Sequence, residues 1–153
     1  MSIKTISTNR KAHYKFHIID KYEAGIALVG SEVKSLRESN VTIKESYVKF
    51  VKNELFTVGM HISEYSHAGY SSHDPIRFRK LLLHKKELSK ISRSIQEKGM
   101  TLIPLKLYFK GGKVKLEFAT AKGKRLWDKR QDIMNKDLQR QAERTYKNKK
   151  IKL

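Results

Sequence analysis

Leu105-Lys-Leu-Tyr-Phe-Lys-Gly-Gly-Lys-Val-Lys-Leu-Glu-Phe118 is the stretch of sequence that decides the fold. Apolar residues alternate with mostly charged ones on both sides of Gly111-Gly112, a pair that favours a two-residue hairpin turn. Such a turn brings the apolar residues into register and places all six on one face. The predicted pairs are Phe109 with Val114, Leu107 with Leu116, and Leu105 with Phe118. The sequence therefore predicts a long antiparallel hairpin with one buried face.

Four shorter stretches predict further strands. The ranges 14–19 and 55–62 alternate apolar with other residues, and Phe56 and Val58 lie on the apolar side of the second range. Both ranges are typical of half-buried strands. Two fuller apolar runs, 24–29 and 46–52, are also compatible with strands. Together with the hairpin, these stretches predict five or six strands.

Two helices are expected between the strands. Ser31 is a suitable N-cap for a short helix that carries Glu32 and Leu36. Apolar residues at helical spacing predict a longer helix from about Lys85 to Lys98, and Gly99 would end it. Pro104 is expected to begin the next strand, where its missing N–H does no harm.

Many short strands with little helix predict a mainly β fold: a small OB-type Greek-key barrel with flanking helices and a basic, flexible or helical C-terminal tail. A sandwich is also compatible with the pattern alone. We expect the barrel to span residues 1–121 and the tail to span 122–153. The tail has a helix-compatible composition but only a thin apolar stripe, so it should be mobile when free and could become helical against RNA.

The charge of the chain points to a polyanionic partner. Its 153 residues contain 34 Lys and Arg against 15 Asp and Glu, a net charge of +19. Residues 1–121 have 22 basic and 11 acidic residues, while the last 32 residues have 12 and 4. A solvated basic surface is the simpler interpretation, but so large an excess favours nucleic-acid binding. Aromatic residues such as Tyr14 and Trp127 could stack on bases, or could be part of the barrel wall.

Enzymatic and metal-binding patterns are weak. Cysteine is absent, and the six histidines show none of the usual metal-ligand spacings. A ribonuclease-like pairing of His13 with Asp20 or Glu23 is conceivable, but no spacing selects it. We therefore expect no catalytic residue, no metal and no cofactor, and a small ribonuclease stays open as the enzyme-class alternative. The first residues lack a signal-peptide pattern and no apolar run could span a bilayer, so a cytoplasmic protein without membrane contact is expected.

Glu32 permits two interpretations. A carboxylate in so basic a chain can offset nearby cations or stabilise a helix N-terminus. A carboxylate that faces RNA is instead repelled by phosphates, so it would have to accept hydrogen bonds from a base edge and would confer specificity. The sequence alone does not decide between these roles.

Several longer motifs together resemble the SmpB family of SsrA-binding proteins. They occur in the family's order and lie within residues 9–130: Asn9-Arg10-Lys11-Ala12-His13, Tyr22-Glu23-Ala24-Gly25-Ile26, Gly30-Ser31-Glu32-Val33-Lys34-Ser35-Leu36-Arg37, the stretch from Asp74 to His84, Ala121-Lys122-Gly123-Lys124, and Asp128-Lys129-Arg130. Two positions depart from the family pattern: Trp127 stands where relatives often have His or Tyr, and Thr145-Tyr146-Lys147 replaces an expected apolar pair and Lys.

The resemblance implies a function without catalysis. A member of this family binds the tRNA-like domain of transfer-messenger RNA and delivers it to stalled ribosomes for trans-translation, that is, for ribosome rescue and peptide tagging. Its partners would be this RNA and the small-subunit decoding centre and message channel of the ribosome, and the protein would act as a monomer on the RNA. The alternative is a generic ribosome-associated or single-strand RNA-binding OB protein.

Charge and resemblance together nominate the site residues. Those expected to bind RNA are Asn9, Arg10, Lys11, His13, Glu32, Lys34, Arg37, Arg77, Arg79, Lys80, Lys122 and Lys124. Those expected to contact the decoding centre are Gly123, Lys124, Trp127, Asp128, Lys129 and Arg130.

Overall fold

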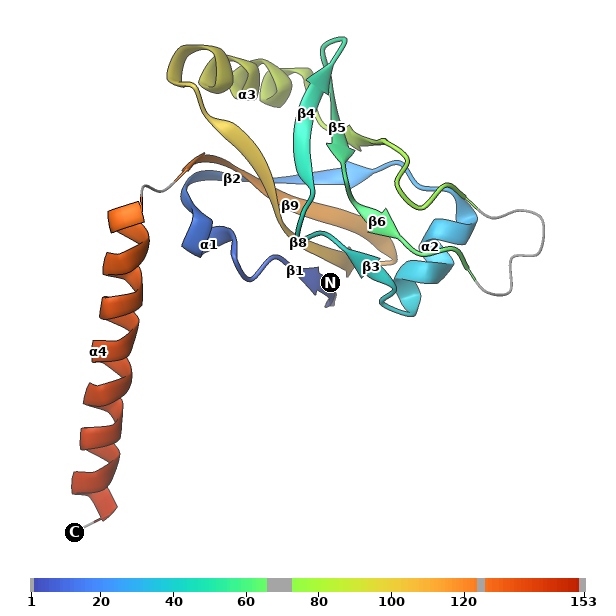
Figure 1. The fold of residues 1–153 in the computed structure, drawn as a ribbon. Coiled ribbons are helices and arrows are strands. Elements are labelled where there is room, and N and C mark those ends of the chain that lie inside the picture. The colour runs from blue at the N-terminus through green and yellow to red at the C-terminus, as the bar shows by residue number, and fades with distance from the viewer. Residues whose placement is uncertain (1, 66–72, 124–125, 152–153) are drawn as a thin grey trace.

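A computed structural model describes residues 2–65, 73–123 and 126–151, with the side chains of 129–131 and 133–145 in the last range. Figure 1 shows a β barrel with flanking helices and one long helix that projects from it. The strands are β1 (Ile3–Thr8), β2 (Phe16–Ile26), β3 (Val41–Thr42), β4 (Tyr47–Val51), β5 (Glu54–Val58), β6 (His61–Ile62), β7 (Arg79–Leu82), β8 (Thr101–Lys110) and β9 (Lys113–Gly123). The helices are α1 (Ala12–Lys15), α2 (Gly30–Arg37), α3 (Lys85–Lys98) and α4 (Leu126–Ile151).

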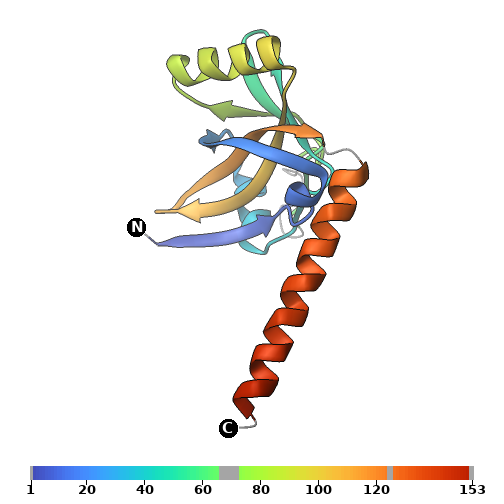
Figure 2. The same ribbon diagram turned by 90° about the vertical axis from the view of Figure 1, so that its left-hand side faces the viewer.

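The large sheet closes on itself. Its seven strands are ordered β1-β8-β4-β5-β7-β2-β9, and β9 also pairs with β8. Strand β8 makes closure possible because one of its edges serves two partners: Leu102 pairs with Val48 of β4, and residues 106–110 pair with β1. The result is the OB-type barrel that the alternating pattern predicted, with β1 added outside the ring and the short β3–β6 pair beside it (Figures 1 and 2).

The hairpin of β8 and β9 confirms two of its three predicted pairs. Phe109 pairs with Val114 and Leu107 with Leu116, but Phe118 pairs with Pro104 because a bulge separates Pro104 from Lys106. The extra residue sends Leu105 to the opposite face, where it packs in a small cluster with Ile103, Ala119 and Ala12. The prediction for Leu105 was therefore wrong, as was the expectation that Pro104 begins the strand.

Strand β5 has the opposite orientation to the one predicted. Leu55 and Thr57 are fully buried, whereas Phe56 and Val58 are only half-buried. At Gly59 the backbone has a φ of +79°, and beyond it the buried residues are Met60 and Ile62. This single residue in the left-handed region shifts the alternation by one position, which the sequence pattern had not revealed.

The helices agree with the sequence in place and differ in detail. Helix α3 spans Lys85–Lys98 and ends at Gly99, as predicted. Helix α2 begins one residue before Ser31, and its N-cap is Val29, so the prediction that Ser31 caps the helix was wrong. Residues 12–15 form α1 rather than the start of a strand. Nine strands occur among the described residues, compared with the five or six expected.

Helix α4 extends away from the barrel instead of forming a layer on it (Figures 1 and 2). It has 26 residues, and its apolar side chains Ile133, Met134 and Leu138 are exposed. The tail is thus helical in this structure. Its apolar stripe is narrow, as the sequence indicated, and exposed to solvent. Within the described ranges, no helix is both long and apolar enough to cross a membrane.

Candidate nucleic-acid interface

Glu32 lies at the centre of a buried ion cluster that joins α2 to β7. One carboxylate oxygen accepts hydrogen bonds from Arg77 Nη2 at 2.5 Å and from the Val29 amide at 2.9 Å. The other oxygen accepts from Arg79 Nε and, at 3.1 Å, from Arg77 Nε. Glu32 and Arg79 are both 0% exposed, whereas the Arg77 side chain is 32% exposed. The cluster therefore reaches the surface through Arg77.

The remaining donors of Arg79 are also satisfied. Its Nη1 donates to the Met60 carbonyl at 2.8 Å and its Nη2 donates to the Pro75 carbonyl at 3.1 Å. Burial lowers the pKa of Arg79, and the adjacent Glu32 carboxylate opposes that effect. For Glu32, burial opposes ionisation, but hydrogen bonds from Arg77, the Val29 amide and Arg79 outweigh it and hold its pKa below the usual value. The cluster is consequently a fully charged and fully bonded network.

Further bonds fasten α2 to the segment between β6 and β7. His73 is buried and accepts or donates at both ring nitrogens: Nδ1 lies 2.8 Å from Ser31 Oγ and Nε2 lies 2.8 Å from the Ile62 carbonyl. Because a carbonyl only accepts, Nε2 donates the hydrogen bond to Ile62. Ser35 Oγ donates to the Ser63 carbonyl at 2.7 Å. The helix is thereby held rigidly against the barrel.

This geometry corresponds to the first of the two interpretations of Glu32. The carboxylate accepts the N-cap amide of α2 and pairs with buried arginines, and it does not reach the surface. The structure thus differs from the expectation that Glu32 and Arg79 face RNA. The reason is that Arg77 and Arg79, 45 and 47 residues further along the chain, fold back onto the N-terminus of α2.

Four other predicted residues have their positively charged groups on the surface around this cluster. Lys34 and Arg37 project from α2 and are exposed, and the Lys34 ammonium lies 5.6 Å from the centre of the Tyr65 ring. Arg77 is partly exposed, and Lys80 on β7 is 43% exposed with an ion pair to Glu54 at 3.0 Å. We call Lys34, Arg37, Arg77 and Lys80 the α2 cluster.

A second group lies around α1. Ala12 is buried in the small core cluster, and Asn9 Nδ2 donates to the Pro104 carbonyl at 3.0 Å, so both fix the backbone here. Arg10, Lys11 and His13 between and beside them are exposed. The nearby Lys44, which sequence analysis did not nominate, lowers the pKa of Lys11 by hydrogen bonding and charge repulsion. Such crowding of lysines favours the binding of an anion.

The base of the tail lies beside the same group. Lys122 and Gly123 are exposed at the end of β9, where they pair with His17 and Phe16. The Lys129 ammonium lies 5.7 Å from the centre of the Tyr14 ring, and Arg130 is exposed. We call Arg10, Lys11, His13, Lys122, Gly123, Lys129 and Arg130 the α1 cluster. Lys124 lies outside the described residues, as do the side chains of Trp127 and Asp128 in α4.

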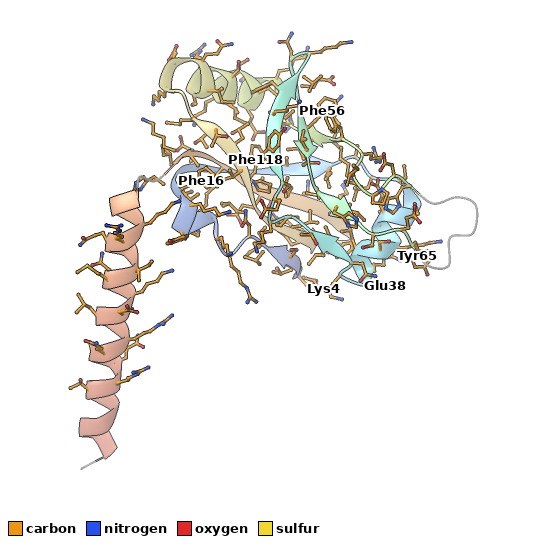
Figure 3. All side chains as sticks on the ribbon, viewed as in Figure 1. Lys4, Phe16, Glu38, Phe56, Tyr65 and Phe118 are labelled. Atoms are coloured by element: carbon orange, nitrogen blue, oxygen red, sulfur yellow. The ribbon has the colours of Figure 1, made fainter. Side chains whose placement is uncertain are left out.

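The structure therefore divides the predicted site residues into two groups. Figure 3 shows Phe16 at the side of the barrel from which α4 departs and Tyr65 at the opposite side. The α1 cluster includes residues from both predicted classes, RNA-binding and decoding-centre contacts, which the chain brings together through the β2–β9 pairing. The α2 cluster lies at the other side.

Glu23 is a surface carboxylate that the sequence analysis did not nominate for RNA binding. Tyr108, itself buried, donates a hydrogen bond to Glu23 Oε2, and Lys110 lies 3.3 Å from Oε1. The bond from Tyr108 lowers the pKa of Glu23, burial opposes that effect, and Lys110 adds to the lowering. The Glu23 side chain is 38% exposed. A signal for it existed in the sequence, since Glu23 and Tyr22 belong to one of the family-like motifs.

In the described part of the chain, no three side chains of the His, Cys, Asp or Glu type come together as potential metal ligands. What the two clusters can bind is phosphate, through the ammonium groups of their lysines and the guanidinium groups of their arginines.

Comparison with known proteins identifies the family. The family model described as SmpB protein matches residues 6–148. The SsrA-binding protein of Syntrophobacter fumaroxidans is 50% identical over 144 residues, which cover 94% of this chain and 89% of that protein. The SsrA-binding protein of Persephonella marina is 49% identical over the full length of both chains, 153 residues.

A solved structure agrees with the sequence comparison. It is described as "tmRNA-SmpB: a journey to the center of the bacterial ribosome", is 43% identical in sequence, and superposes with a TM-score of 0.65 over 78% of this chain and 85% of that one. With the family model spanning almost the whole sequence and a solved relative superposing on 78% of the chain, this chain belongs to the SmpB family of SsrA-binding proteins.

Proposed function

We propose that this protein binds transfer-messenger RNA and accompanies it to stalled bacterial ribosomes, where it takes part in trans-translation. The observation that carries the proposal is the 49% identity to an SsrA-binding protein over the full length of both chains, because no part of the relative is missing here. The net charge of +19 gives the physical means, since each phosphate contact releases counterions and adds to affinity.

We further propose a division of labour between two parts of the chain. Residues 1–121 form the barrel that grips the tRNA-like domain, and residues 122–153 form the tail that enters the decoding centre and the empty message channel. The projection of α4 away from the barrel supports this division, as does its high density of positive charge. Message RNA in the channel would exclude the tail, so tail insertion would be favourable only on ribosomes that lack message.

The two basic clusters fit these two tasks. The α1 cluster lies where the tail leaves the barrel, so its cations would bind RNA phosphates between the barrel-bound RNA and the ribosome. The α2 cluster is held on a rigid support, since Glu32 and Arg79 fix the position of Arg77. A pre-positioned guanidinium loses little entropy when it binds a phosphate. In this proposal Glu32 acts on RNA binding through Arg77 and not by direct contact.

We propose that Glu23 has the role of base-edge acceptor. Tyr108 and Lys110 orient its exposed carboxylate, so it can accept hydrogen bonds from a base without first being ordered. Glu23→Gln should weaken binding to transfer-messenger RNA by on the order of 1–3 kcal/mol. Glu97→Gln, which removes an exposed carboxylate from α3, makes the same charge change and should not weaken binding. Equal effects of both variants would show that Glu23 contributes only through net charge.

We also propose that the protein catalyses no reaction and works as a monomer in the cytoplasm, because its relatives are binding proteins and its partner is the bacterial ribosome. Incubation of labelled RNA with the pure protein, with and without Mg²⁺, tests the first point. Cleavage that follows the protein through purification would contradict it.

The proposal as a whole is tested by selectivity. Transfer-messenger RNA should compete much more strongly than an unstructured RNA of equal length at about 0.15 M salt, because specific contacts persist where purely ionic binding weakens. Equal competition by both RNAs would favour a generic single-strand RNA-binding protein, the alternative that the family comparisons do not favour.

A further inference from the structure

The outer face of β4, β5 and β7 presents aromatic rings to solvent. Val48, Leu55, Thr57 and Arg79 point into the barrel, so their neighbours along each strand point outward. The outward residues include Tyr47 and Lys49 of β4, Phe56 and Val58 of β5, Lys80 of β7, and Phe78 just before β7. Tyr47 is 44% exposed and Phe78 is 49% exposed. We call these six residues the aromatic face; Figure 3 labels Phe56 on it.

The strand register places cations beside the rings. Lys49 pairs with Phe56, and Phe56 pairs with Lys80, so one aromatic ring lies in a row between two lysines. Neighbouring strands are about 4.8 Å apart, so each lysine is an immediate neighbour of the ring. Tyr47 pairs with Val58 in the adjacent row. The Lys49 ammonium also lies 5.1 Å from the centre of the Phe78 ring, a cation–π contact that holds Phe78 in place.

The charge around the aromatic face is positive. Lys49, Lys80 and, at the β4–β5 turn, Lys52 bring three cations, against Glu54, which is already paired with Lys80 at 3.0 Å. An apolar protein partner would be poorly matched to rings interspersed with lysines, because the lysines would have to be desolvated. Unpaired nucleotides match both features, since their bases stack on rings and their phosphates pair with ammonium groups.

We propose that the aromatic face binds a short stretch of unpaired RNA, with bases stacked on Phe56, Phe78 and Tyr47 and phosphates on Lys49 and Lys80. This goes beyond the proposed function, which requires a folded RNA and the ribosomal channel, and it uses a surface that neither basic cluster needs apart from Lys80. Stacking tolerates any base, so the face contributes affinity for single-stranded RNA without strong sequence preference.

A fluorescein-labelled octauridylate tests the inference with the full-length protein, by fluorescence anisotropy over a range of salt concentrations. Phe78→Ala should weaken binding by about tenfold at every salt concentration, because loss of a stacking ring removes no charge. Lys49→Gln should instead reduce the slope of log affinity against log salt by about 0.7. Phe78→Tyr keeps a ring and should bind like the original protein.

Two controls make the result specific. Ile3→Ala removes an exposed apolar side chain from β1, away from the aromatic face, and should leave octauridylate binding unchanged. Inorganic polyphosphate, which has charge but no bases, should bind equally to the original protein and to Phe78→Ala. Since Phe78 is half exposed, its variant should fold normally, which far-UV circular dichroism checks; Tyr47→Ala provides a second, independent loss of a ring.

The inference is overturned if Phe78→Ala and Tyr47→Ala bind octauridylate as well as Ile3→Ala does, or if they lose polyphosphate binding to the same extent. A surface meant for a protein partner would give the first of these results. Failure of the proposed function is a separate outcome, because it would appear as a lack of preference for transfer-messenger RNA in the unaltered protein.

Discussion

Replacement of Glu32 by Gln tests the buried ion cluster most sharply. The substitution keeps the shape of the side chain and an oxygen that can still accept the Val29 amide, but it removes the negative charge. Arg79 is 0% exposed and would remain buried without a counter-charge. Breaking one side of a buried ion pair in this way costs about 3–5 kcal/mol. Arg77 is partly exposed and can turn to solvent, so the loss of its ion pair with Glu32 adds little to this cost.

Urea denaturation followed by far-UV circular dichroism measures this cost. With a slope of about 1–3 kcal/mol per molar urea, the midpoint should fall by on the order of 2 M. The matched control is Glu54→Gln, which breaks the exposed pair with Lys80 and should cost less than about 1 kcal/mol. Equal shifts for the two variants would refute the reasoning, because Glu32 would then behave as a surface group.

The stability difference between the original protein and Glu32→Gln should depend on pH. The pKa of Glu32 is lowered on folding, so its contribution is complete above the unfolded-state pKa of about 4.3 and is lost as pH falls through the lower folded-state pKa. The difference in unfolding free energy between the original protein and Glu32→Gln should therefore be constant from pH 7 down to about 5, and should shrink in stronger acid. A difference that grows on acidification would contradict the assigned charge state.

Three further predictions concern the barrel and the tail. Gly59→Ala should lower the free energy of unfolding by about 1 kcal/mol more than Gly99→Ala does. Both glycines have positive φ, but a Cβ at Gly59 would lie 3.3 Å from the Glu45 carbonyl oxygen, whereas a Cβ at Gly99 would have no atom within 4 Å. Tyr108→Phe should weaken binding to transfer-messenger RNA by about 0.5–1.5 kcal/mol while leaving the thermal midpoint within a few degrees, because it releases the oriented Glu23; an unchanged affinity would argue against that orientation. In the free protein, amides in the second half of α4 should exchange hydrogen within seconds while those of β9 are protected, since a helix without tertiary packing is only marginally stable; equal protection would mean that the tail is already ordered.

Local chemistry made the hairpin predictable, and tertiary contacts decided what was missed. Gly111-Gly112 and the alternating residues beside them are sufficient for the register next to the turn. The bulge at Leu105 depends on partners far away in sequence: the backbone amide of Asn9 donates to the Leu105 carbonyl at 2.8 Å and the Asn9 side chain donates to Pro104. The local sequence pattern of β8 cannot predict these contacts with Asn9.

The candidate site shows the same limit. The basic composition and the family-like motifs nominated the site residues, and most of the predicted cations for which side chains are described lie on the surface. Glu32 permitted two roles in the sequence because the choice depends on Arg77 and Arg79, which reach it only through the closure of the barrel. The bonding of Glu23 could not be predicted because its partners Tyr108 and Lys110 are 85 and 87 residues away.

The central claim is that the barrel binds the RNA and the tail acts on the ribosome. It is tested most directly by a chain that ends at Gly123, the last residue of β9, compared with the full-length protein. The shortened protein should retain most of its affinity for isolated transfer-messenger RNA at about 0.15 M salt, yet fail to support peptide tagging on stalled ribosomes. Loss of RNA affinity with the tail, or tagging that persists without it, would contradict the account.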